Sequence, residues 1–108
     1  MSVKKTDIPY ETLNLLVLKT LDTMGPMHGF GLARRIEQLA ENLVRLNQGS
    51  IYPALLRLQQ KRMIATKWGI SENGRRAKFY SLTTKGKKEL DSEVENWQRA
   101  TSLVARFL

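Results

Sequence analysis

Basic side chains are concentrated in one third of this chain, and they are its strongest candidates for chemistry. Ten of the 18 Lys and Arg residues lie between Arg57 and Lys88, where Glu72 is the one acidic residue. The rest of the chain is nearly balanced in charge, although the whole carries a formal net charge of +8. Solvated faces usually mix both signs, so this separation favours a surface that binds the phosphates of a nucleic acid over a basic surface without a partner.

Two groups of side chains in or beside this basic segment are of the types that read duplex DNA. Arg57 and Ser50 fall on the predicted outward side of a helix, where Arg suits guanine edges and Ser or Gln suits bases and phosphates. Arg75 and Arg76 follow a predicted turn, and adjacent arginines there suit a narrow, negatively charged minor groove. The plainer alternatives are a solvated helix face and an edge charge that prevents aggregation. The outward side of the helix is expected to be polar and basic, and its predicted contacts also include Gln48 and Lys61.

The chain does not contain the residues that other kinds of chemistry require. The chain has no cysteine and one histidine, His28, which excludes disulfides, thiol catalysis and thiolate zinc sites. No nucleophile–base pair can be assembled, so we expect no catalytic site, no metal and no cofactor. His28 is expected to cap or pack at the start of a helix. A secreted domain of this size often needs disulfides, so the lack of cysteine favours a cytoplasmic protein. The apolar stretch Leu13–Met24 carries Lys19 and Asp22 and is too short to span a membrane, so no membrane partner is expected.

Three helices are predicted in the first part of the chain. Apolar residues at helical spacing predict a helix over Glu11–Met24, which Gly25-Pro26 would stop. A second, shorter helix includes Leu32 to Leu39 and would begin near His28. A third spans Gln48–Arg62, with Asn47 as its N-cap, Pro53 early in it and an extended connector, Leu43–Leu46, before it.

A hairpin and a long helix follow. Alternation predicts strands over Ile64–Ile70 and Ala77–Leu82, joined at the turn dipeptide Asn73-Gly74. The last segment, Thr84–Leu108, has apolar residues at heptad spacing that are interrupted by Thr101, with Leu103 and Phe107 beside them. We interpret it as a dimerisation helix, with intramolecular packing as the alternative. Its predicted contacts are Leu90, Val94, Trp97, Val104 and Leu108.

The order of these elements is that of a winged helix-turn-helix protein. The fold class is therefore mainly α with a small β-hairpin, in one domain. We expect a flexible N-terminal arm over residues 1–10, a DNA-binding domain over 11–83 and a C-terminal dimerisation helix over 84–108. The third helix would lie in the major groove, and the hairpin would be the wing. A dimer would present two such helices about one helical turn apart, which implies a palindromic operator.

Three stretches of the chain form a pattern in the expected order. They are Met27-His28-Gly29-Phe30, then Gly49-Ser50-Ile51-Tyr52-Pro53-Ala54-Leu55 with Arg57-Leu58, and GRRAKFYSLT over residues 74–83. With these stretches the chain resembles the PadR family of bacterial transcriptional regulators, in its small subgroup with one C-terminal helix. The resemblance covers nearly everything from Leu13 to Leu108. Gly86 also falls where the family usually has a glycine. Met63 stands where the family usually has a glycine before the first wing strand, which implies a changed local turn.

The resemblance implies a homodimeric DNA-binding regulator, usually a repressor, whose DNA affinity falls when a small-molecule effector binds. Such effectors are often aromatic acids or lipophilic drugs. Carried over by position, Tyr52 and Pro53 join the helix contacts and Lys78 joins the wing contacts. Trp97 matches a position at which a family member stacks planar ligands between its protomers. The alternative is that Trp97 is an ordinary core residue.

Three other functions are alternatives to a sequence-specific regulator. A sequence-independent duplex-binding or architectural protein would bind any fragment equally, whereas a specific regulator gains about 10³–10⁷ over random DNA. An RNA-binding module would need a stacking platform, and the few aromatic residues lie at core-like positions. An enzyme would need groups that the chain does not supply.

Overall fold

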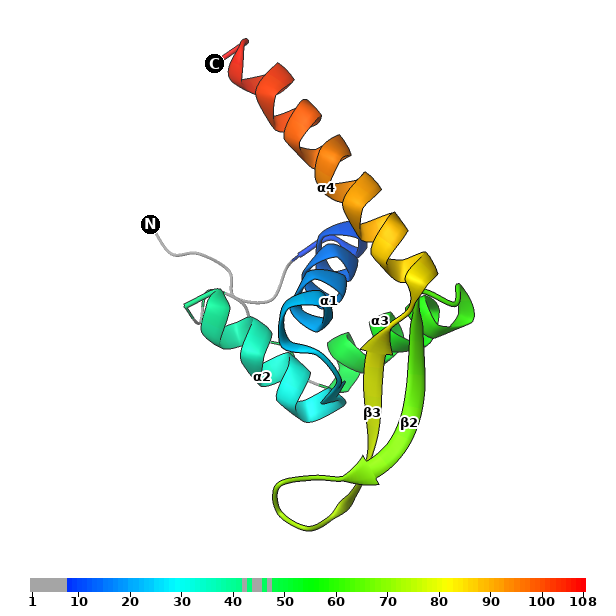
Figure 1. The fold of residues 1–108 in the computed structure, drawn as a ribbon. Helices are drawn as coiled ribbons and strands as arrows, with labels where there is room; N and C mark the ends of the chain where they lie inside the picture. The colour runs from blue at the N-terminus through cyan, green and yellow to red at the C-terminus, as the bar shows by residue number, and fades with distance from the viewer. Residues whose placement is uncertain (1–7, 42, 44–45, 47) are drawn as a thin grey trace.

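A computed structural model describes residues 8–41, 43, 46 and 48–108, with only the backbone described at Gln48. The first three helices pack together against a small sheet, the hairpin projects from one end of the molecule and the last helix extends from the other (Figure 1). The mainly helical class and the winged helix-turn-helix order predicted from the sequence are confirmed. The elements are α1 (Tyr10–Met24), β1 (Met27–His28), α2 (Gly29–Leu39), α3 (Gln48–Gln60), β2 (Ile64–Ile70), β3 (Arg76–Leu82) and α4 (Thr84–Ala105).

The predicted start and stop signals of the first two helices are confirmed. Gly25 ends α1 with φ of 81°, a conformation that glycine adopts without strain, and its N–H donates to the Leu21 carbonyl at 2.9 Å. His28 is the N-cap of α2, because its Nδ1 accepts a hydrogen bond from the Gly31 N–H at 3.0 Å. The predicted Asn47 cap and part of the predicted connector Leu43–Leu46 lie outside the described residues.

The sheet has one more strand than the sequence predicted. Its antiparallel order is β1-β3-β2, and β1 pairs Met27 with Tyr80 and His28 with Phe79. Two residues are too short for any alternation of polar and apolar positions, so periodicity could not reveal β1. The hairpin pairs run from Ile64–Leu82 to Ile70–Arg76, and a loop with Gly74 at φ of 74° closes it.

The core lies between α1, α2, α3 and one face of the sheet, and α4 contributes to it. Leu90 of α4 is as deeply buried as the central leucines of α2 and α3. Gly86 allows this approach, because a Cβ there would overlap the backbone carbonyl of Met63. Thr83 caps α4 by accepting from the Gly86 N–H at 3.0 Å. The first turns of α4 thus pack into the same core as the helices and strands of residues 11–83.

The third helix is two residues shorter than predicted. Beyond Gln60 the N–H of Met63 donates to the Leu58 carbonyl, and the N–H of Arg62 donates to the Gln59 carbonyl, both at 2.9 Å. These bonds form a Schellman C-cap, which places Arg62 at φ of 61°. Glycine usually occupies this position of the cap, but here Arg62 occupies it. The left-handed residue is therefore Arg62, and not its neighbour Met63, where the resemblance implied a changed turn.

Candidate nucleic-acid interface

The side of α3 that faces away from the core is uncharged. Its exposed residues recur at helical spacing, and none of those between Gly49 and Gln60 carries a charge. Leu56, at the centre, is 55% exposed, whereas Leu55 and Leu58 are buried on the opposite side. The prediction of a polar and basic outward side is therefore wrong, although Pro53 and Gln60 do face outward. We call this surface the α3 stripe; it consists of Gly49, Tyr52, Pro53, Leu56 and Gln60.

Arg57 lies beside the stripe and packs against the first helix. Its guanidinium carbon lies 3.8 Å from the centre of the Tyr10 ring, a cation–π distance. Its Nη2 is buried and has no hydrogen-bond partner among the described residues. The predicted outward placement of Arg57 is thus wrong, since the guanidinium connects α3 to α1. Ser50 is on the same flank and is half-buried.

The two ends of the predicted helix surface differ. Gln48 has its backbone in the first turn of α3, and its side chain is outside the description. Lys61 follows the last turn and is exposed. It lines a small hollow together with Glu11, Glu89 and Glu93, from α1 and α4. Carboxylates around Lys61 make this end of the helix a poor site for phosphate.

Tyr52 connects the α3 stripe to α2. A Cβ at Gly29 would come within 2.8 Å of Cε1 and Oη of Tyr52, so the glycine lets the ring approach the α2 backbone closely. Burial raises the pKa of Tyr80 above its usual value, and the neighbouring Tyr52 raises it further. Tyr52, which is 39% exposed, links α2 to α3 at the edge of the stripe.

The wing carries an aromatic–cationic cluster on one face. Trp68 pairs directly with Lys78, and Ile70 pairs with Arg76, so these side chains project from the same face of the hairpin. The Arg76 guanidinium lies 4.5 Å from the centre of the Trp68 ring, and the Lys78 Nζ lies 5.7 Å from it. We call Trp68, Arg76 and Lys78 the Trp68 cluster. The sequence analysis missed Trp68, although its cross-strand position opposite Lys78 could have indicated it.

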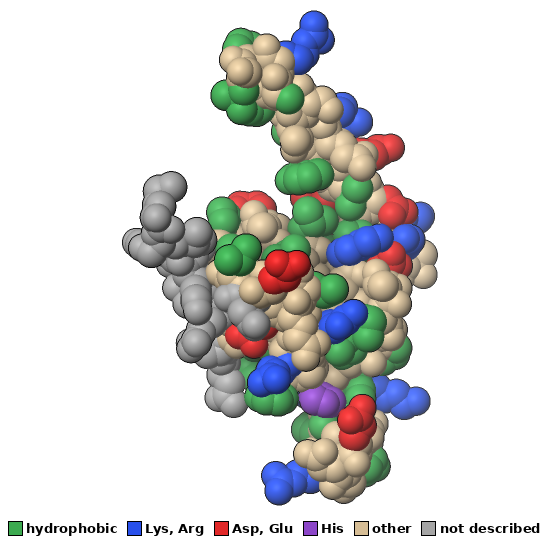
Figure 2. Space-filling view, turned by 90° about the vertical axis from the view of Figure 1, so that its left-hand side faces the viewer, with side chains coloured by type: hydrophobic (Ala, Val, Ile, Leu, Met, Phe, Trp, Pro, Cys, Tyr) green, Lys and Arg blue, Asp and Glu red, His purple; other side chains and the backbone are tan. Residues whose placement is uncertain are grey.

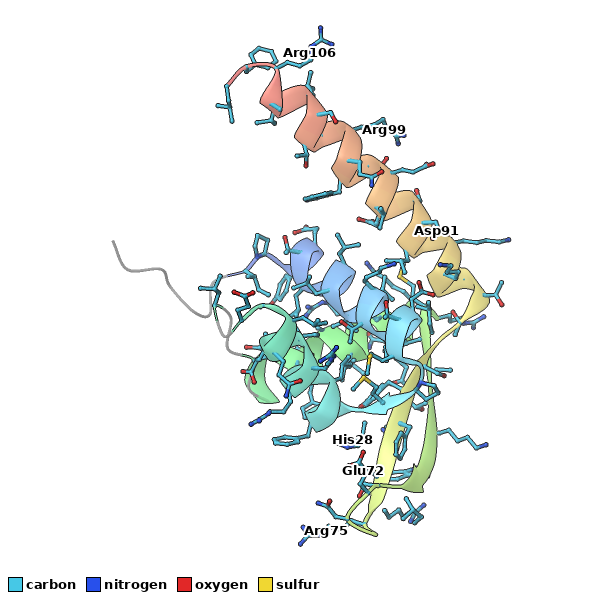
Figure 3. All side chains as sticks on the ribbon, turned by 60° about the vertical axis from the view of Figure 1, so that its left-hand side comes forward. His28, Glu72, Arg75, Asp91, Arg99 and Arg106 are labelled. Carbon is cyan, nitrogen blue, oxygen red and sulfur yellow. The ribbon has the colours of Figure 1, made fainter. Side chains whose placement is uncertain are left out.

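The two adjacent arginines of the wing have different surroundings. Arg75 is in the exposed loop and lies at the far end of the wing in Figure 3, whereas Arg76 begins β3 and stacks on Trp68. Both arginines were predicted at the protruding turn, but Arg75 alone lies in the loop. Figure 2 shows His28 where the wing meets the rest of the molecule. There its ring meets Phe79 edge to face, with 5.7 Å between centroids.

The predicted heptad seam of α4 divides into two parts. Leu90 is buried in the core of its own protomer, and Val94 is half-buried against that core. The prediction that Leu90 contacts a second protomer is therefore wrong, because no surface of it remains free. Beyond Val94, every residue of α4 is exposed, and the helix extends away from the domain (Figure 1). The exposed large apolar residues of this segment are Trp97, Leu103 and Val104, and Phe107 and Leu108 follow the last turn of the helix.

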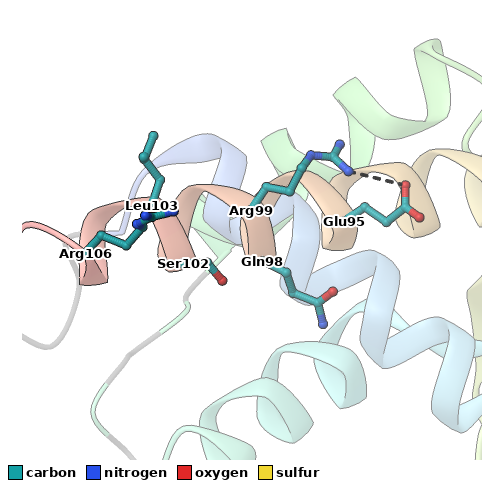
Figure 4. A pocket seen from close by; sticks show the side chains of 6 residues that line it. All are labelled: Glu95, Gln98, Arg99, Ser102, Leu103 and Arg106. Carbon is teal, nitrogen blue, oxygen red and sulfur yellow. Dashed lines mark ion pairs between the residues drawn. The ribbon is translucent and has the colours of Figure 1, made fainter.

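Polar side chains occupy another side of the same segment. Figure 4 shows a shallow groove along α4 where Arg99 lies 4.0 Å from the Glu95 carboxylate, and where Gln98 and Ser102 also project. Leu103 and Arg106 line its far end. The free part of α4 is thus amphipathic, which is typical of a helix that packs against a partner.

An ion pair between Lys87 and Asp22 joins the base of α4 to α1. The Lys87 Nζ lies 3.1 Å from Oδ2 of Asp22 and 3.4 Å from Oδ1 of Asp91. The hydrogen bond to Asp22 is the main reason that the pKa of Lys87 is raised, and Asp91 adds to it. Together with Leu90, these contacts set the direction in which the free part of α4 leaves the domain.

Known structures share this arrangement. A transcriptional regulator from Clostridium thermocellum is 21% identical and superposes with a TM-score of 0.80 over 91% of this chain and 94% of its own. A PadR family transcription regulator from Clostridium difficile is 26% identical, with a TM-score of 0.77 over 92% of this chain and 98% of its own. Among the described residues no helix is both long and apolar enough to cross a membrane.

Sequence comparison points to the same relationship. An uncharacterized protein X from Lysinibacillus sphaericus is 24% identical over 81 residues, which are 75% of this chain and 74% of that protein. The family model described as "Transcriptional regulator PadR-like family" matches residues 17–92, from the middle of α1 into α4. The chain therefore belongs to the PadR-like family of transcriptional regulators and is a DNA-binding regulator.

Proposed function

We propose that this regulator binds a specific, palindromic operator as a homodimer and represses transcription from it. The observation that carries the proposal is the separation of two surfaces. The wing projects from one end of the molecule, the exposed apolar part of α4 extends from the other, and α3 lies in the domain between them (Figure 1). The wing and the α3 stripe suit DNA, and the free part of α4 suits a second copy of the chain.

The α3 stripe would lie in the major groove, and the wing would follow the neighbouring minor groove. Tyr52 and Pro53 are the proposed contacts on the stripe, together with Gln48 and Ser50 in the first turn of α3. Arg75, Arg76 and Lys78 would bind phosphates and the minor-groove edge. Arg57 and Lys61 are not included, because Tyr10 and the acidic hollow account for their positions.

The proposed dimer forms through the free part of α4. Trp97, Val104 and Leu108 recur at heptad-like spacing, and a large exposed apolar surface on a monomer usually marks an interaction site. Val104→Glu should therefore give monomers in light scattering. A matched control is Ser102→Glu, which adds the same charge on the polar side and should leave dimers. Persisting dimers in Val104→Glu would place the interface elsewhere.

Release by a small-molecule effector is the second part of the proposal. The Trp97 indole is 60% exposed on the free part of α4, where a dimer would bring it near its partner. A planar aromatic or lipophilic molecule could then stack between protomers. In Trp68→Phe, Trp97 is the one remaining tryptophan. Its fluorescence should be quenched by dye-like planar compounds that also weaken DNA binding. Quenching without weaker DNA binding would mean a site with no regulatory role.

The decisive experiment compares DNA from upstream of the protein's own gene with a scrambled fragment of equal length, across a salt series. Tight binding to the upstream fragment alone, with two chains per site, supports the specific regulator. Equal binding to both fragments that disappears as salt rises supports a sequence-independent duplex binder or an operator elsewhere. Selection from random duplexes separates these two outcomes, because only a specific protein enriches a common sequence. Repression itself is tested by in vitro transcription from the bound promoter.

A further inference from the structure

We infer that Leu56 reads the C5-methyl groups of thymines in the operator, and so makes this regulator prefer T·A pairs opposite the middle of α3. The inference rests on the proposed function and names a specificity determinant within it. It begins from the position of Leu56, which is 55% exposed at the centre of the α3 stripe.

Packing within the protomer does not account for this exposed leucine. The residues around it on the helix, Pro53 and Gln60, are exposed as well. The core side of α3 is already filled by Ile51, Ala54, Leu55 and Leu58. An isolated exposed leucine is ordinary on a protein surface. Leu56, however, lies between the apolar rings of Tyr52 and Pro53 and the polar Gln60, on the face that the winged helix-turn-helix arrangement directs at the major groove.

The chemistry of the major groove leaves one apolar partner for such a side chain. Base edges there present hydrogen-bond donors and acceptors, apart from the C5-methyl group of thymine. The exposed residues of the stripe bring no charge to this face, whereas Arg75, Arg76 and Lys78 of the wing supply the attraction to the backbone. The apolar face of α3 therefore fits thymine methyl groups in the major groove, while the neighbouring wing binds the phosphates of the same duplex.

The test uses uracil substitution in a duplex selected from random sequences with the intact protein. Replacing one dT by dU removes the methyl group and leaves every hydrogen-bonding edge unchanged. At one or two positions in each half-site, dU should weaken binding of the wild-type protein by about fourfold, the effect of one buried methyl group. The same substitutions should have no effect on Leu56→Ala, whose affinity for the thymine duplex is already reduced.

A matched variant controls for the loss of a leucine as such. Leu39 is 59% exposed on α2, outside the stripe, and Leu39→Ala should respond to uracil as the wild type does. The circular dichroism melting curves of both variants should match that of the wild type.

Two results would overturn the inference while leaving the proposed function intact. One is specific binding with no uracil-sensitive position. The other is an equal uracil effect in Leu56→Ala and the wild type, which would assign the methyl contact to another residue. If no common sequence is selected at all, the proposed specific regulator fails, and the inference fails with it.

Discussion

The α3 stripe and the wing are neighbours, yet they present opposite chemistry. The stripe has no exposed charge and has Leu56 at its centre, whereas the wing carries Arg75, Arg76 and Lys78. Two of these cations are held on the face of Trp68. Phosphate contacts provide affinity without sequence information, and contacts to base edges provide specificity. The difference suggests that this small regulator separates the two tasks, with affinity on the wing and specificity on the helix.

The largest effect is expected from removing the wing arginines. Arg75→Ala combined with Arg76→Ala should weaken binding to any duplex by about a hundredfold or more, because two charge-assisted hydrogen bonds to phosphate can no longer form. The salt dependence should fall by about 0.9 in slope for each phosphate that the protein no longer neutralises. Fluorescence anisotropy across a salt series measures both quantities. An unchanged slope would remove the wing from the phosphate interface and break the comparison.

A cation introduced into the stripe should erase the difference between the two regions. Leu56→Lys should strengthen binding to random DNA and increase the salt slope by about 0.9, since the new ammonium neutralises one more phosphate. Discrimination between operator and random DNA should fall by about tenfold, because the leucine no longer touches the bases. Leu39→Lys on α2 is the matched control. Improved discrimination in Leu56→Lys would contradict the assignment of specificity to an uncharged face.

Arg57 provides a test of where the stripe ends. Arg57→Ala should lower the free energy of unfolding by about 1 kcal/mol, as expected for a partly buried cation–π contact. Tyr10→Leu should cost about the same, and the double variant should cost less than the sum, since both remove one interaction. Urea denaturation measures these values. A loss of preference for one base pair in Arg57→Ala would instead place this side chain in the groove.

A smaller effect is expected at the tryptophan that supports the wing cations. Trp68→Ala should weaken DNA binding by about threefold, because Arg76 and Lys78 lose the ring that orders them before binding. The loss should be equal for operator and random DNA, and the salt slope should not change. A selective loss on the operator would mean that the indole itself reads sequence.

The smallest effect is expected at Arg62, where α3 ends and the path to the wing begins. Arg62→Gly should raise the free energy of unfolding by about 0.5 kcal/mol. Relief of a left-handed backbone conformation contributes about 1–2 kcal/mol, and the greater freedom of glycine in the unfolded chain offsets part of it. Thermal melting measures the change. A lower melting temperature would mean that the Arg62 side chain stabilises the junction.

Local signals were enough to predict most elements of the fold. Gly25-Pro26 ended α1, and Asn73-Gly74 marked the hairpin loop, because both depend on backbone conformations that few residues adopt. Helical spacing of apolar residues identified α3 and α4 but not their ends. A Schellman cap ends α3 at Gln60. Glycine is the residue that usually reveals such a cap in a sequence, and here Arg62 stands in its place.

The candidate site was predicted less completely. Arg75, Lys78 and Pro53 are exposed as expected. Arg57 was misplaced, because helical periodicity defines a core side but does not reveal that Tyr10 of another helix covers a flank. Leu56 and Trp68 were missed for a related reason, since an apolar residue on an exposed face is assigned to the core by its type.

The sequence by itself determined the order of the elements, the location of the net positive charge in one segment and the absence of thiol chemistry. These properties depend on composition and on short-range backbone preferences. Tertiary structure alone decided which flank of each helix stays free. It turned Arg57 toward Tyr10, gathered Arg76 and Lys78 on Trp68 and divided α4 into a core part at Leu90 and a free part beyond Val94. The physical reason is that a side chain's exposure depends on the elements that pack around it, and distant parts of the chain supply those elements.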